Sequence, residues 1–139
     1  MPPTEPVEPE KTYEQLLDEV VEEVGLYPVQ AYEFIQQGLG YTVNKVHGDV
    51  KDPKISRHIG GRDLCEGLRE FALLRWGMMA RTVLSRWNVR KTIDFGRIVF
   101  ALVDGGLMQK TEEDSVEDFR DVFDFKTAFE AGYRIESKV

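Results

Sequence analysis

Four side chains that could bind a metal or carry out acid–base chemistry lie close together in the sequence: His58, Asp63, Cys65 and Glu66. Their spacing matches no zinc motif, because a second cysteine or a paired histidine is missing. Cys65 and His58 could form a nucleophile and its base. The surrounding "RDLCEGLRE", however, is typical of a helix in which a thiol is buried and inert. We therefore predict no metal, no cofactor and no catalytic residue, and keep a small enzyme of unknown reaction only as a third alternative.

Basic side chains gather in the middle of a chain whose net charge is −7. Residues 57–97 carry 9 basic and 4 acidic side chains, whereas residues 1–52 carry 3 and 11, and residues 98–139 carry 5 and 10. Such a distribution can mark a surface for an acidic protein, a nucleotide or nucleic acid. Alternatively, these side chains pair with nearby acids such as Glu66 and Glu70. The candidate binding residues are Arg62, Arg69, Arg75, Arg81, Arg86, Arg90, Lys91 and Arg97.

Hydrophobic periodicity predicts five helices that would position these side chains, near residues 13–24, 28–46, 62–76, 78–87 and 92–105. Thr12 and Gln15 have the spacing of a capping box. Gly25 and Asn88 fit helix ends, and Thr92 fits an N-cap. Gly38 and Gly40 lie inside the second helix, where they either allow close packing of another helix or break the helix near residue 40.

Short strands are predicted near residues 55–59, 107–111 and 120–125, and "KTAFEAG" (126–132) is predicted to be a last short helical piece. Two helices joined by a short turn, followed by a strand pair, have the order of a winged helix–turn–helix. The predicted fold class is therefore mostly α, or α+β. It is a helical domain with a winged-helix-like C-terminal half and a small antiparallel hairpin or sheet.

A DNA-reading function requires a basic outer face on the helix near 92–105. With the apolar side of that helix buried, one arginine and two acids would face solvent, and the loop at 112–118 is acidic. Charge therefore argues against DNA, although a DNA-binding regulator stays the first alternative. The outer face would consist of Thr92, Asp94, Arg97, Ala101 and Asp104.

The length of 139 residues predicts one globular domain over 12–139, preceded by a disordered acidic and Pro-rich tail over 1–11. The only cysteine cannot form an internal disulfide, which favours a reducing cytoplasm. No apolar run approaches the length of a membrane span, so no membrane partner is predicted.

The long stretch at 57–125 resembles an uncharacterised family of bacterial conserved hypothetical proteins, restricted mainly to verrucomicrobia and planctomycetes. The shared pattern has a His-hydrophobic-x-Gly lead into a helix, which falls on His58, Gly61, Leu64, Glu66 and Gly67. It continues over 82–87, 92–107, 110–114 and 124–125, and "YPVQAYEFIQQGLGYT" (27–42) resembles the family's second helix. The resemblance implies a cytosolic bacterial protein and adds no catalytic residue. The predicted function is a non-catalytic protein-interaction or regulatory module, with an oligomeric state that the residues do not define.

Overall fold

The structure is a computed structural model that describes residues 10–48 and 58–136, with side chains described as far as residue 130. Almost all of the predicted tail (1–11) and most of the predicted strand at 55–59 lie outside these ranges. The elements, in chain order, are α1 (Tyr13–Val24), α2 (Val29–His47), α3 (Gly61–Trp76), η1 (Gly77–Met79), α4 (Ala80–Arg86), α5 (Thr92–Asp104), η2 (Val116–Phe119) and α6 (Phe125–Glu136). The mostly helical fold class is thus confirmed.

The ends of α1 follow from its local sequence. The side chain of Thr12 accepts a hydrogen bond from the N–H of Gln15, and the Gln15 side chain accepts one from the N–H of Thr12. This is the predicted capping box, which satisfies two of the N–H groups that have no partner within a helix. At the other end Gly25 has a φ of 68°, a left-handed conformation that costs glycine little.

Helices α2 and α3 approach each other closely because glycines line their crossing. A Cβ on Gly67 of α3 would lie 1.8 Å from Oγ1 of Thr42 on α2. Conversely, a Cβ on Gly38 of α2 would lie 2.3 Å from the side chain of Leu68 on α3. Gly40 has no such neighbour, and α2 continues past it unbroken. Gly38 therefore has the predicted role of allowing close packing of another helix. Neither Gly38 nor Gly40 breaks the helix.

A short turn joins α4 to α5, and both helices end in the same way. Asn88 follows α4 with a φ of 65°, and the N–H of Val89 donates to the carbonyl of Leu84 at 2.9 Å. Gly106 follows α5 with a φ of 78°, and the N–H of Leu107 donates to the carbonyl of Leu102 at 2.8 Å. These are Schellman endings, in which one left-handed residue lets the chain leave the helix axis at once. The predicted role of Asn88 is confirmed.

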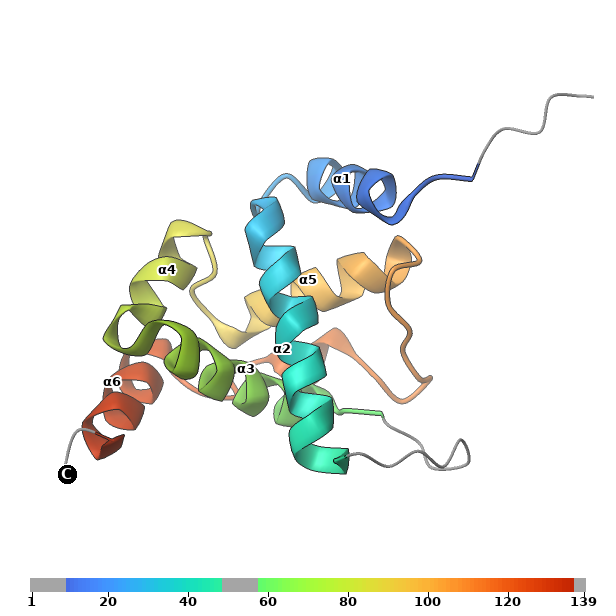
Figure 1. The fold of residues 1–139 in the computed structure, drawn as a ribbon. Coiled ribbons are helices and arrows are strands. Elements are labelled where there is room, and N and C mark those ends of the chain that lie inside the picture. The colour runs from blue at the N-terminus through green and yellow to red at the C-terminus, as the bar shows by residue number, and fades with distance from the viewer. Residues whose placement is uncertain (1–9, 49–57, 137–139) are drawn as a thin grey trace, which may run out of the picture.

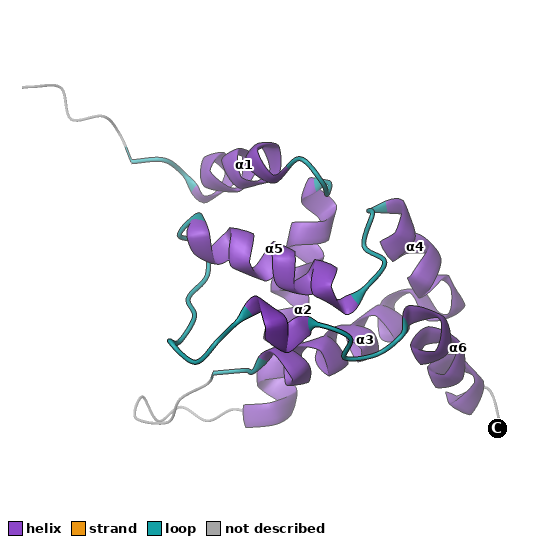
Figure 2. Cartoon of the chain, turned by 180° about the vertical axis from the view of Figure 1, so that it is seen from behind, coloured by secondary structure: helices purple, strands orange, loops and turns teal. Residues whose placement is uncertain are grey.

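Helix α5 lies across α2 near the middle of the molecule, with α1 beside it and α3, α4 and α6 grouped to one side (Figures 1 and 2). Its side chains Phe95, Ile98 and Leu102 are fully buried. Phe119 of η2 packs on Gly96 of α5, where an added Cβ would lie 2.8 Å from it. The short η2 turn therefore closes the core against α5 with an aromatic ring.

The predicted strands at 107–111 and 120–125 are wrong. Figure 2 shows only helices and loops among the described residues. Residues 107–111 form bends and irregular chain, and Asp114 accepts hydrogen bonds from the N–H and hydroxyl groups of Thr111, which starts a turn where the first segment ends. In the second segment Asp121 has a φ of 50°, and the N–H of Val122 donates to the Thr92 hydroxyl at 3.1 Å rather than to a neighbouring strand.

Without a strand pair in the described chain after α5, the expectation of a wing or β-hairpin has no support. The aromatic residues that alternate with polar ones near residue 120 instead belong to the core. Phe119 and Phe125 are buried, and Phe125 begins α6, which is longer than the predicted short piece. Apolar and polar residues alternate here because η2 and the start of α6 each direct one aromatic side chain into the core. No helix in the described ranges combines the length and apolar character needed to span a membrane.

Candidate functional site

The eight basic residues predicted to form a binding surface lie in three places. Arg62, Arg69 and Arg75 lie on α3, Arg81 and Arg86 on α4, and Arg90, Lys91 and Arg97 at the start of α5. Of these eight, only Arg97 forms an ion pair with an acid of the described chain. Glu70, one of the acids suggested as a partner for arginine, pairs with Lys45. Within the described residues, internal ion pairs therefore account for little of the predicted basic surface.

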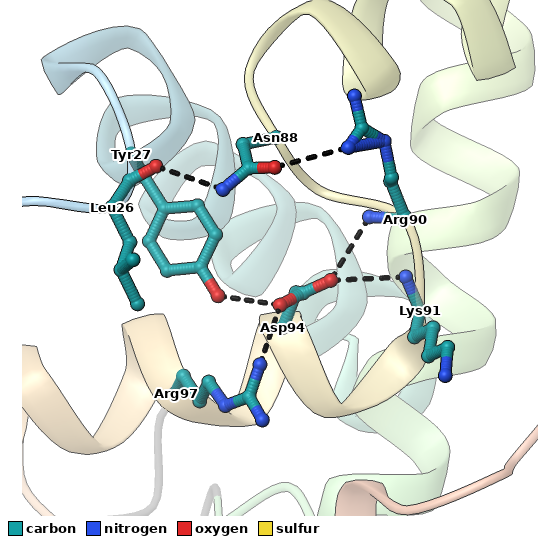
Figure 3. A network of polar contacts seen from close by, with 7 residues as sticks. All are labelled: Leu26, Tyr27, Asn88, Arg90, Lys91, Asp94 and Arg97. Atoms are coloured by element: carbon teal, nitrogen blue, oxygen red, sulfur yellow. Dashed lines mark hydrogen bonds and ion pairs between the residues drawn. The ribbon is translucent and has the colours of Figure 1, made fainter.

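The group at the start of α5 is organised by the carboxylate of Asp94 (Figure 3). Its Oδ1 accepts hydrogen bonds from the Tyr27 hydroxyl and, at 3.0 Å, from Nη1 of Arg97. Its Oδ2 accepts from the backbone N–H groups of Arg90 and Lys91 at 2.9 and 3.1 Å. Asp94 thus satisfies N–H groups before α5 and ties this turn to Tyr27, which precedes α2.

A second link joins the same two segments. Nδ2 of Asn88 donates to the carbonyl of Leu26 at 3.2 Å, and its Oδ1 accepts from Nη1 of Arg90 at 3.1 Å (Figure 3). Burial and the hydrogen bond to Asp94 raise the pKa of Tyr27 far above its usual range. Hydrogen bonding to Tyr27 and to Asp94 also raises the pKa of Arg97. These hydrogen bonds hold the α4–α5 turn against the segment that precedes α2.

This network corrects the predicted outer face of α5. Asp94 is 7% exposed and Thr92 is 1% exposed, so neither presents its side chain to a partner. The N-cap is Lys91 rather than Thr92, whose hydroxyl accepts from Val122. Only Arg97 and Asp104 of the predicted face are exposed, and Arg97 is held by Asp94. Helical spacing predicted Asp94 to be exposed because its hydrogen-bond partner Tyr27 lies far away in the sequence, where a local pattern does not show it.

Arg75 and Arg81 lie on either side of the corner where α3 passes through η1 into α4. The guanidinium of Arg75 lies over the rings of Phe71 and Trp76, at 5.7 and 5.5 Å from their centroids, and donates to the side chain of Gln37. Arg81 is exposed and has no partner among the described residues. Neither charge is neutralised by an acid of the described chain.

Three large apolar side chains are exposed at this corner. Leu74 is 67% exposed, Met78 is 69% exposed and Met79 is 53% exposed. In a helix over 78–87, as predicted, Met79 would lie on one apolar stripe with Val83, one turn further on. Residues 77–79 form a 3-10 turn instead, beginning at Gly77 with a φ of 54°. Because this turn precedes α4, the helix starts later than predicted and Met79 lies outside it. We define the corner surface as Leu74, Arg75, Met78, Met79 and Arg81.

The residues considered for nucleophilic or metal chemistry do not converge. Cys65 is fully buried, and burial raises the pKa of its thiol to about 12, so the reactive thiolate is suppressed. His58 instead pairs with Asp114, with 2.9 Å between Nε2 and Oδ1. Within residues 10–48 and 58–136, no three His, Cys, Asp or Glu side chains cluster as metal ligands. Cys65 and His58 thus do not form the nucleophile and base considered above.

No protein-family model, curated protein or solved structure matches this chain. The resemblance over residues 57–125 accordingly stays an expectation.

Proposed function

We propose that this protein is a non-catalytic interaction module, and that its corner surface binds an acidic segment of another protein that also carries apolar side chains. The observation that supports this proposal is the exposure of Leu74, Met78 and Met79 next to Arg75 and Arg81. Exposed apolar side chains within a polar rim are typical of protein-binding sites. Methionine adapts well to such a role, since its flexible thioether can fit differently shaped partners.

Charge complementarity selects the acidic partner. The two arginines at the corner form no ion pair with an acid of the described chain. A carboxylate of a partner could therefore bind them without displacing a carboxylate of this chain. Arg75 is also held by two aromatic rings and by Gln37, which lowers the entropy lost when it binds a carboxylate. An acidic amphipathic helix supplies both the apolar and the charged contacts.

A cytoplasmic location belongs to the same proposal. It is supported by the single cysteine, which is free and buried and has no disulfide partner in the chain.

Selection from a library of random displayed peptides tests the proposed function. Peptides enriched on the wild-type protein should combine Glu or Asp with Leu, Phe or Met. Their binding should weaken as salt rises, because salt screens exposed charges. The double variant Met78→Ser/Met79→Ser should lose these peptides, whereas Val46→Ser, which changes an equally exposed apolar residue on α2, should retain them. Enrichment of basic peptides, or equal binding by the two variants, would contradict the proposal.

A further inference from the structure

A second surface, independent of the corner, surrounds a cavity of about 360 Å³ between α2, α3, α5 and η2. Its walls are apolar and include Leu39, Val43, Leu64, Val99, Phe100 and Phe119. A volume of this size is at the small end of the range for sites that bind small molecules, and such sites are usually apolar with a few polar groups.

The polar groups that line the cavity belong to His58, Gln109, Lys110, Thr111 and Asp114. Asp114 is already engaged there: Oδ1 contacts His58 at 2.9 Å, and Oδ2 accepts from the N–H and hydroxyl of Thr111. Both carboxylate oxygens of Asp114 therefore have hydrogen-bond partners within the chain, and His58 adds a positive charge beside them only when it is protonated. The neighbouring acids Glu112 and Glu113 do not line the cavity.

Lys110 contributes the remaining charge among these groups. Its Nζ lies 5.7 Å from the centroid of the Phe100 ring, which is itself part of the cavity wall. In the described part of the chain no acid lies within ion-pair distance of this ammonium group. A cation placed over an aromatic ring and beside an apolar cavity is suited to an anionic head group whose apolar body enters the cavity.

We propose that this cavity binds a small amphipathic carboxylate, with its apolar body between α2 and α5 and its carboxylate on Lys110. This site does not depend on the proposed function of the corner surface.

Isothermal titration calorimetry with decanoate, kept below its micelle concentration, tests this site. Decanoate should bind saturably, and decanol, which lacks the charge, should bind about tenfold more weakly because it loses the charge-assisted hydrogen bond. Lys110→Met should weaken decanoate binding by about tenfold and remove the difference between the two ligands. Lys126→Met, which changes an exposed lysine of α6, should behave as the wild type does.

A blocking variant locates the apolar body of the ligand. Val43→Trp should fill the cavity and abolish decanoate binding, whereas Val46→Trp, further along α2 and outside the cavity, should not affect it. Circular dichroism establishes that both variants are folded. The proposal is overturned if wild-type protein shows no saturable binding, if folded Val43→Trp binds decanoate normally, or if decanol binds as tightly as decanoate.

Discussion

Asp94 illustrates how one residue can connect parts of the chain that are far apart in the sequence. Its carboxylate is nearly buried and accepts hydrogen bonds from Tyr27, two backbone N–H groups and Arg97. The two N–H groups lie just before α5, where an acid is also favoured by the helix dipole. The acid is therefore a structural residue that fixes the α4–α5 turn against the start of α2.

Replacing Asp94 should cost stability accordingly. Asp94→Asn should lower the free energy of unfolding by about 2–4 kcal/mol, because the amide cannot accept all of these hydrogen bonds and leaves buried donors unsatisfied. Asp104→Asn is the matched control at the exposed end of the same helix and should change stability by less than about 0.5 kcal/mol. Urea unfolding followed by tryptophan fluorescence measures both values. Equal effects of the two substitutions would show that the network contributes nothing.

At the scale of the elements, the crossing of α2 and α3 depends on which glycine faces the other helix. Gly67 faces Thr42, whose hydroxyl donates to the carbonyl of Gly38 at 2.7 Å and thereby keeps the side chain close to α2. Gly40 lies on the same helix as Gly38 but faces open space. The two types of helical glycine look alike in the sequence, and only the packed neighbour distinguishes them.

Alanine substitutions at Gly67 and Gly40 should change the free energy of unfolding in opposite directions. Gly67→Ala should destabilise the protein by about 1–3 kcal/mol, since the added methyl group overlaps Thr42 and forces the helices apart. Gly40→Ala should stabilise it by about 0.5–1 kcal/mol, because alanine loses less backbone entropy in a helix. Thermal or urea unfolding measures the difference. Combining Gly67→Ala with Thr42→Ala should cost less than the sum of the single effects, and strict additivity would rule out the contact as the cause.

At the scale of the whole molecule, α5 is an interior helix. It contacts α1, α2, α3 and η2, and among the described residues no strand pair follows it. A recognition helix must instead project its outer face into the major groove. Of the positions that would do so here, Thr92 and Asp94 are buried and Arg97 is bound by Asp94, and the acidic segment at 112–118 follows α5 in the chain.

The protein is therefore expected not to bind DNA by α5. A mobility-shift titration with duplex DNA should show no complex even at low salt, the condition under which contacts to phosphates are strongest. A complex that weakens steeply with salt and is lost in Arg97→Ala would contradict this expectation. A complex that is lost instead in Arg81→Ala/Arg86→Ala would place nucleic acid on the α4 surface.

The sequence by itself determined most helix boundaries. Capping groups such as Thr12 and left-handed stops such as Asn88 act through neighbours within a few residues, so their effect can be read from local spacing. The corner surface was only partly predictable. Its arginines were identified, but the exposure of Met79 depends on the 3-10 turn at Gly77.

Tertiary structure alone decided the rest. It placed Phe119 against Gly96 and Asp94 against Tyr27, contacts whose partners are separated by many residues and cannot be inferred from a local pattern. A distant contact also replaced the predicted strand at 120–125 with a turn, since the N–H of Val122 donates to the Thr92 hydroxyl rather than to a second strand. The turn that begins at Thr111 is local by contrast, because its N–H donates to Asp114 three residues further on. Tertiary packing also placed Lys110 beside an apolar cavity, a position that composition does not reveal.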